Sequence, residues 1–474
     1  MKMKLLFSAV LVALVACLAS CLGDDAEYTY SDSTALTSFY VSEMQQTIHT
    51  LDSLGNDSTY EDELDCEDYA FYIDQQQCLV YNPDSLPYGC DETRVLCAAT
   101  SQNSGVIGIK SLTSDSIVAL SSSDTIDFSS PREIYVYSNS GKAYRKYTVH
   151  VNVHKEEADS FVWKQMATVD DFAALSGMRA VPCGGTLYLF GSDGSNTVVY
   201  KSDGGADWEQ VEFSDGVTLD ADAYKSAITI NDYLYICSDG TVMKSDDGAA
   251  WYSTGGDNLT QLVAASRFRL YAYDADGTLL ESADDGATWT ASEIDESADL
   301  LPTQDITTVC EALETNELTD RVIFVGNRSL YDYPGDNIPL IWGKIDEGAD
   351  DSEEQPWTYY RVAADNGRQA PRLEGMQTAL YDGGLIAIGG DGIDKKGETH
   401  DAFDAFYSSG DLGITWIADT IVSFPDDFEC DESVFALTTD SDNFLWVVCG
   451  GSGQVWRGRT NRLGWTEEQR KFTE

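Results

Sequence analysis

Basic residues are scarce in this sequence. Its 474 residues include 29 Lys and Arg against 81 Asp and Glu, with only 4 His, so the formal net charge is −52 at pH 7. Nucleic acids and anionic membrane surfaces repel so acidic a chain, and both are poor partners for it. Apolar residues make up 43% of the sequence. This content indicates a folded protein with an acidic surface and not a disordered acidic chain.

Residue spacings that bind metals are also missing. The sequence has no Cys-x-x-Cys pair, no Cys/His cluster and no EF-hand-like spacing of carboxylates. His150 and His154 lie four residues apart in a predicted strand, which separates them by about 13 Å. That is too far for two ligands of one zinc ion. We therefore expect no metal site and no cofactor.

One apolar run, from Leu5 to Leu18, stands at the start of the sequence. It is shorter than the roughly 20 apolar residues that a membrane-spanning helix needs. Lys2 and Lys4 precede it, as in a secretory signal peptide. Such a signal peptide can serve either plain secretion or the export of a lipoprotein, and plain secretion is kept as the alternative.

The end of this segment favours a lipid anchor. In Leu18-Ala19-Ser20-Cys21 a small residue precedes a cysteine, as lipoprotein signal peptidase requires. We favour Cys21 over Cys17 as the lipidated residue because polar sequence begins directly after it. Residues 1–20 are then the signal peptide and 21–27 an acidic tether, which resembles the tag of surface-exposed Bacteroidetes lipoproteins. This resemblance implies an outer-membrane protein that faces outward.

Four cysteines cluster in the N-terminal part of the remaining chain, namely Cys66, Cys78, Cys90 and Cys97. In an exported protein they predict two disulfides, with three connectivities open. The cysteines further along, such as Cys237 and Cys449, lie in apolar runs and are expected to be buried thiols.

Residues 28–158 are predicted to form a β-sandwich. Glu133–Tyr137 and Tyr144–Val153 form a predicted hairpin around Asn139-Ser140-Gly141, and apolar and polar residues alternate in its second strand. This hairpin resembles the last two strands of Ig-like or cadherin-like domains. The segment from Leu36 to Leu54 fits either a short helix or a strand.

A repeated motif dominates residues 159–474. Ser282-Ala283-Asp284-Asp285-Gly286-Ala287-Thr288-Trp289 and Ser409-Gly410-Asp411-Leu412-Gly413-Ile414-Thr415-Trp416 both match the pattern Ser-x-Asp-x-Gly-x-Thr-Trp. Two looser copies contain Asp203, Gly205 and Trp208, and Asp246, Gly248 and Trp251. The Asp should accept backbone N–H groups in a turn, the Gly should adopt positive φ, and the Trp should pack on the hairpin. These roles are structural.

Strands led by tryptophan recur along this region, beginning at Trp163, Trp208, Trp251, Trp289, Trp357, Trp416 and Trp465. Most of the sequence separations between successive tryptophans match the roughly 40–50 residues of a four-stranded propeller blade. We predict an all-β chain with a six-bladed propeller, in which the Trp163 strand completes the last blade. Seven blades are the alternative.

The motif resembles the Asp box of sialidases, sortilin-type receptors, photosystem assembly factors and some glucanases. The overall layout resembles uncharacterised Bacteroidetes surface lipoproteins that carry an N-terminal sandwich of unknown function. Sialidases bind the substrate carboxylate with three arginines, for which Arg179, Arg328 and Arg372 are candidates. The Phe/Tyr-Arg-Ile-Pro motif of that family is absent, so no catalytic residue is assigned.

A long insertion, Arg328–Asp351, offers candidate ligand-binding aromatics in Tyr331, Tyr333 and Trp342. Packing of these aromatics on an outer strand is the alternative. We expect a surface lipoprotein that recognises a glycan or a cell-surface protein without catalysis. The chain's charge predicts a neutral or cationic ligand unless arginines cluster locally. A sialidase or other glycoside hydrolase, and a structural subunit of an outer-membrane complex, are the alternatives.

Overall fold

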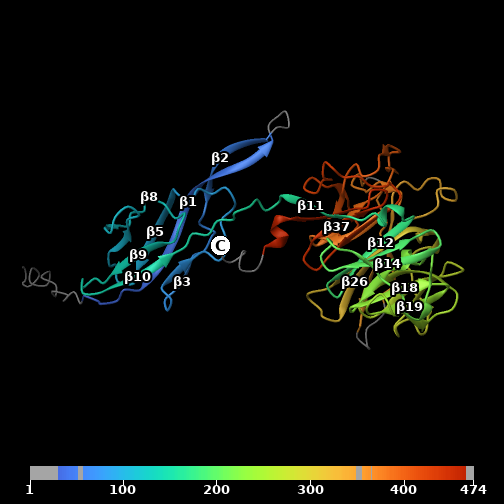
Figure 1. Ribbon diagram of the computed structural model, residues 1–474. Coiled ribbons are helices and arrows are strands. Elements are labelled where there is room, and N and C mark those ends of the chain that lie inside the picture. Colours follow the sequence, from blue (N-terminus) through green and yellow to red (C-terminus); the bar gives the residue numbers. More distant parts are fainter. Residues whose placement is uncertain (1–29, 52–56, 349–354, 364–365, 466–474) are drawn as a thin grey trace, which may run out of the picture. The chain divides into compact units, whose positions relative to one another are not determined.

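The computed structural model describes residues 30–51, 57–348, 355–363 and 366–465 (Figure 1). The predicted signal peptide, Cys21 and the acidic tether lie outside these residues. Within them the chain is all-β, with strands joined by loops and short 3-10 helices. The chain divides into two compact units, and Trp465 groups with the residues up to Glu157 while Ala158–Gly464 form the second unit. The predicted boundary is within a residue of this division, but Trp465 was expected in the propeller.

The first unit contains two sheets, as a sandwich requires. The first has the order β2-β1-β5-β8 and consists of β1 (Leu36–Leu51), β2 (Asp57–Asp65), β5 (Val95–Ser101) and β8 (Thr125–Ile126). The second has the order β3-β4-β10-β9-β6-β7 and consists of β3 (Tyr72–Asp74), β4 (Leu79–Tyr81), β6 (Ile107–Lys110), β7 (Ile117–Ala119), β9 (Arg132–Tyr137) and β10 (Tyr144–Val149).

The predicted hairpin is confirmed, because β9 and β10 pair antiparallel. Strand β10 ends at Val149, four residues earlier than predicted, although Val151 and Val153 remain buried. Buried side chains from both sheets, among them Phe39, Val95 and Tyr147, form one core. The segment from Leu36 is a strand and not a helix.

The predicted disulfides are absent. Cys66, Cys78, Cys90 and Cys97 are free thiols, as are the other five cysteines of the described residues. Burial raises the pKa of the Cys66 thiol to about 11 and that of Cys97 to about 12. Three of the four are buried in the sandwich core, where they pack as small apolar side chains.

The second unit contains six sheets in which four strands follow one another antiparallel. The first three are β12 (Gly177–Cys183), β13 (Thr186–Ser192), β14 (Asn196–Ser202) and β15 (Glu209–Gln210); β17 (Ile228–Ile230), β18 (Tyr233–Ser238), β19 (Thr241–Ser245) and β20 (Tyr252–Gly255); and β21 (Leu259–Ala265), β22 (Leu270–Asp274), β23 (Leu279–Ser282) and β24 (Thr290–Ala291). A short strand, β16 (Leu219–Asp220), also pairs with β14.

The other three sheets continue the series. They are β25 (Gln304–Ala312), β26 (Thr319–Asn327), β27 (Leu340–Glu347) and β28 (Thr358–Tyr359); β30 (Gln377–Tyr381), β31 (Gly384–Ile388), β34 (Tyr407–Ser409) and β35 (Ile417–Ala418); and β36 (Phe435–Thr439), β37 (Leu445–Cys449), β38 (Gln454–Thr460) and β11 (Phe161–Thr168). A small additional sheet has β29 (Arg372–Leu373), β32 (Gly392–Ile393) and β33 (Thr399–His400). The 3-10 helices are η1 (Phe172–Ala174), η2 (Ser214–Gly216), η3 (Ala223–Ser226), η4 (Ala298–Leu300) and η5 (Asn461–Gly464).

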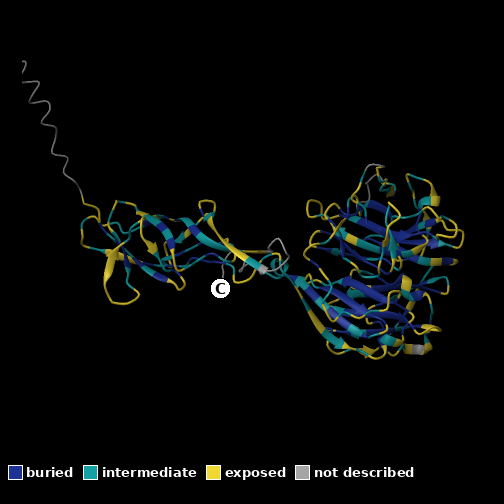
Figure 2. Ribbon diagram, turned by 90° about the horizontal axis from the view of Figure 1, so that it is seen from above, coloured by how far each residue is buried: buried dark blue, intermediate teal, exposed yellow. Residues whose placement is uncertain are grey.

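The ring is closed by its first and last strands. Strand β11 pairs antiparallel with β38, so that Trp163 lies opposite Gly458. The prediction that the Trp163 strand completes the last sheet is therefore confirmed. This arrangement, six sheets of four successive strands with a shared closing sheet, is that of a β-propeller. Apolar clusters between neighbouring sheets hold the ring together, and the strands of this unit are largely buried (Figure 2).

The four repeated motifs form one kind of turn, between the third and the outer strand of a sheet. A serine Oγ accepts the N–H of the motif glycine at 2.7–2.9 Å, and the tryptophan Nε1 donates to the carbonyl of the same glycine at 2.8–3.1 Å. The glycines have φ between 76° and 107°, which other residues resist. These glycines are Gly205, Gly248, Gly286 and Gly413.

The aspartate of the turn holds the backbone after the glycine. Asp284 accepts the N–H and the hydroxyl of Thr288 at 2.8 and 2.7 Å, and Asp411 holds Thr415 in the same way. The bond from the Thr288 N–H is the main cause that keeps the pKa of Asp284 below its ordinary value. In these two copies the predicted structural roles are present.

The two looser copies differ from the prediction. Asp247, and not Asp246, accepts two backbone N–H groups at 2.8 Å, from Ala249 and Ala250. Asp203 follows Ser202 in the turn, but its carboxylate accepts the Thr186 hydroxyl at 2.8 Å. In both copies the serine stands three residues before the glycine instead of four, which shifts the alignment by one position. Trp251 and Trp416 are buried, whereas Trp208 and Trp289 are only half-buried.

Candidate functional site

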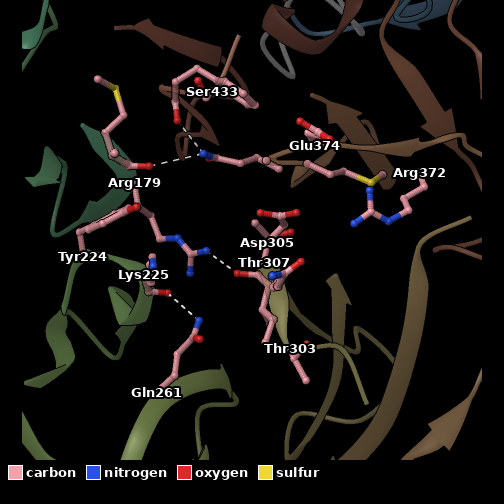
Figure 3. A pocket seen from close by; sticks show the side chains of 18 residues that line it. Arg179, Tyr224, Lys225, Gln261, Thr303, Asp305, Thr307, Arg372, Glu374 and Ser433 are labelled. Atoms are coloured by element: carbon pink, nitrogen blue, oxygen red, sulfur yellow. Dashed lines mark hydrogen bonds between the residues drawn. The ribbon is translucent and has the colours of Figure 1, made fainter. Parts of the chain in front are cut away.

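The innermost strands of the propeller enclose two successive cavities. The first, of about 580 Å³, is lined at the beginnings of β12, β21, β25, β30 and β36 and by η3. The second, of about 410 Å³, is lined further along these strands and by β17. Arg179, Thr307 and Gln377 contribute to both cavities. The first cavity therefore collects side chains from all around the ring, and we treat it as the candidate site (Figure 3).

Arg179 lies where the two cavities meet. Strand β12 carries it, and its guanidinium donates to the carbonyl of Ile306 on β25. The surrounding protein lowers the pKa of Arg179 to about 10, mainly through burial. The group is still a cation at neutral pH.

Arg372 enters the first cavity from the small sheet formed by β29, β32 and β33. Its side chain is only 5% exposed. One guanidinium nitrogen donates to the carbonyl of Arg328 at 3.1 Å, while Nε has no hydrogen-bond partner. In Figure 3 Arg179 and Arg372 approach the cavity from opposite walls, with Asp305 between them.

The remaining charges of the first cavity have partners or face solvent. Lys225 pairs with Asp222 at 2.7 Å. Asp305 accepts the side-chain amide of Asn327 at 2.9 Å, and Glu374 is exposed. The lining thus includes three basic and two acidic residues. Since Lys225 is neutralised by Asp222, two arginines and two carboxylates remain in the lining, a far more even balance than in the whole acidic chain.

Neutral polar groups form the rest of the inner wall. Gln377 bridges neighbouring sheets, because its amide donates to the Phe435 carbonyl at 2.6 Å and accepts the Leu437 N–H at 3.0 Å. The hydroxyls of Thr307 and Thr378 are hydrogen-bonded at 2.7 Å. These contacts fix the strands that carry the cavity side chains, so the cavity is preformed.

The aromatic residues predicted to bind ligand do not form a common site. Tyr331 is 94% exposed, but Trp342 is fully buried in β27, where its Nε1 donates to the Leu300 carbonyl at 2.9 Å. Tyr333 is half-buried and stacks on the Arg328 guanidinium, 3.7 Å from its centre. The prediction of an exposed residue is wrong for Trp342. The inserted loop is shorter than expected because β27 begins at Leu340.

The three candidate arginines of the sialidase alternative do not share one site. Arg179 and Arg372 line the first cavity, but Arg328 does not. Two nitrogens of Arg328 donate to the Asp336 carboxylate at 2.8 Å each, and a third donates to the Asp299 carbonyl. Arg328 therefore anchors the loop that follows it.

In the described part of the chain, no group of three or more His, Cys, Asp or Glu side chains could hold a metal ion. No helix among the same residues is long and apolar enough to span a membrane.

The fold and its axial cavities define the second unit as a β-propeller domain. Residues 157–468 match the DUF6242 beta propeller domain, and residues 39–151 match the N-terminal domain of unknown function of the same family. The chain belongs to the DUF6242 family. No curated protein is significantly similar to it in sequence.

Solved structures with a similar fold include other propellers. YCF48 from Cyanidioschyzon merolae is 16% identical with a TM-score of 0.34, and the match covers 63% of this chain and 98% of that one. YCF48 bound to D1 peptide is 14% identical with a TM-score of 0.36, covering 65% and 97%. A protein of unknown function from Bacteroides thetaiotaomicron is 8% identical with a TM-score of 0.37, covering 83% and 98%.

Proposed function

We propose that this protein is a surface-anchored binding protein whose propeller takes a ligand, a glycan or part of a cell-surface partner, in the first cavity. The observation that carries the proposal is the convergence of polar side chains from around the ring on one preformed cavity of about 580 Å³. Small-molecule sites have volumes of about 300–1,000 Å³ and a few convergent polar groups. The propeller is then a rigid frame, and the four Asp-box-like turns stabilise it.

Recognition without catalysis fits the residues that line the cavity. Of the described residues, Asp305 and Glu374 are the carboxylates that line it. Asp305 accepts the side-chain amide of Asn327, and Glu374 is exposed, so neither lies in the apolar surroundings typical of a general acid. The glycosidase alternative needs such an acid together with a second carboxylate.

Glycan and peptide arrays on the protein lacking residues 1–20 test this proposal, together with fluorogenic sialosides and glycosides as substrates. We expect a bound ligand on an array and no hydrolysis above the rate without enzyme. Turnover of a fluorogenic substrate at enzymatic rates would contradict the proposal.

The anchor part of the proposal rests on Cys21 and the residues before it. Cells that express the protein should incorporate an alkyne-tagged palmitate into it, and Cys21→Ala should abolish both the label and recovery in the membrane fraction. A labelled, membrane-bound Cys21→Ala protein would show that the lipid is not on Cys21.

A further inference from the structure

The arginines of the first cavity lack carboxylate partners in a protein with a large excess of carboxylates. The chain has 81 acidic residues for 29 basic ones. Elsewhere in the propeller, Arg267, Arg328 and Arg462 each pair with an aspartate at the surface or between strands. Within the described residues, neither Arg179 nor Arg372 forms an ion pair. Asp305 lies between them in Figure 3, but its carboxylate accepts the side-chain amide of Asn327.

This arrangement is unfavourable for the folded protein alone. Arg372 is buried, and a buried charge without a counter-charge costs free energy that its hydrogen bond to the Arg328 carbonyl compensates only in part. Arg179 is half-buried and donates to the Ile306 carbonyl. Nε of Arg372 is buried and has no hydrogen-bond partner among the described residues. A ligand anion would supply the missing charge, and such unsatisfied groups in a cavity are typical of binding sites.

The uncharged lining indicates the rest of the ligand. Hydroxyl and amide side chains, including Gln261, Thr303, Gln304 and Ser433, border the cavity. In the described part of the chain, Tyr224 and Phe435 are the aromatic side chains of this lining. Met178, Ile306 and Met376 add apolar side chains, but polar groups predominate in this wall, which suits a ligand rich in hydroxyl groups.

We propose that the first cavity binds a sugar acid, with its carboxylate paired to Arg179 and Arg372 and its hydroxyls on the neutral polar wall. This inference rests on the proposed function and names the ligand class of the same site. It also departs from the expectation from net charge, because two arginines without ion-pair partners line this cavity of an acidic protein.

Isothermal titration calorimetry on the protein lacking residues 1–20 tests the inference with defined probes. D-glucuronate and D-galacturonate are compared with D-glucose and D-galactose, and N-acetyl-dialanine represents a peptide carboxylate. We expect at least one sugar acid to bind more than tenfold more tightly than its neutral counterpart and than the peptide acid. Arg179→Gln and Arg372→Gln should each weaken it about ten- to hundredfold, as for a hydrogen bond to a charged group.

Arg459→Gln is the matched control. Arg459 also lacks a carboxylate partner, but it stacks on Phe444 and donates to the Asp442 carbonyl, outside the first cavity. Its substitution should leave binding unchanged. Arg372→Lys keeps the charge in a less suitable geometry and should bind more tightly than Arg372→Gln, whether or not either variant melts at a lower temperature.

Three results would overturn the inference. In the first, acid and neutral sugars bind with equal affinity, and Thr303→Trp, which fills the cavity, abolishes the binding of both. This result would show that the ligand is not a sugar acid, while the proposed site would stand. Tighter binding of N-acetyl-dialanine would replace the sugar by a peptide acid. Binding of a sugar acid that neither arginine substitution weakens would place its carboxylate elsewhere.

Discussion

Replacing Trp342 by alanine is expected to lower the free energy of unfolding of the propeller by about 3–5 kcal/mol, as for other fully buried tryptophans. Trp342 is 0% exposed and packs in the cluster between the third and fourth sheets. The substitution leaves a cavity there and removes the donor to the Leu300 carbonyl. Chemical denaturation followed by tryptophan fluorescence measures the change.

Tyr331→Ala is the control for this experiment because the two aromatics come from the same predicted insertion. Tyr331 is 94% exposed, so its removal should change the unfolding free energy by less than about 0.5 kcal/mol. A similar loss of stability for both variants, or for neither, would contradict the placement of Trp342 in the core.

The second large effect is expected at Asp346, which joins the third and fourth sheets. Its fully buried carboxylate on β27 accepts the Tyr271 hydroxyl at 2.9 Å and also contacts Ser266 and Arg269. Asp346→Ala removes a fully buried carboxylate together with its contacts to Tyr271, Ser266 and Arg269, so we expect a loss of about 3–5 kcal/mol.

Asp276→Ala provides the comparison for Asp346→Ala. Asp276 is an exposed turn residue of the third sheet, and its removal should cost no more than about 0.5 kcal/mol. The melting temperatures of the two variants are compared with that of the parent protein. An Asp346→Ala protein as stable as the Asp276→Ala protein would show that this network does not hold the sheets together.

The fold could be predicted in large part because its determinants are local. Each Ser-x-Asp-x-Gly-x-Thr-Trp motif specifies a turn within eight residues, and its recurrence reveals a repeating sheet. The pairing of β11 with β38 followed from the position of Trp163 before the first repeat. The prediction was wrong where the turn is one residue shorter than the motif. There Asp247, and not the predicted Asp246, reaches the backbone N–H groups of the turn.

The site could not be predicted in the same way. Arg179 and Arg372 are far apart in the sequence, and only closure of the ring brings them to one cavity. No spacing pattern in the sequence indicates that these two arginines lie close together. The sequence analysis therefore named them only as members of a candidate triad with Arg328. Trp342 was misplaced for a related reason, because the sequence does not show where the insertion ends and β27 begins. The length and the aromatic residues of the insertion predicted a ligand-binding site in that loop, and not in the cavities enclosed by the innermost strands.

The central claim is that a ligand enters the first cavity, and one comparison tests it directly. Thr303 is exposed at the rim of this cavity, while Thr290 is exposed on the outer strand β24 and away from it. Thr303→Trp and Thr290→Trp add the same bulk to the propeller, so their effects on an array-identified ligand can be compared by titration calorimetry. The account predicts that Thr303→Trp abolishes binding and Thr290→Trp leaves the affinity unchanged. Full affinity in Thr303→Trp, with an unchanged melting temperature, would contradict it.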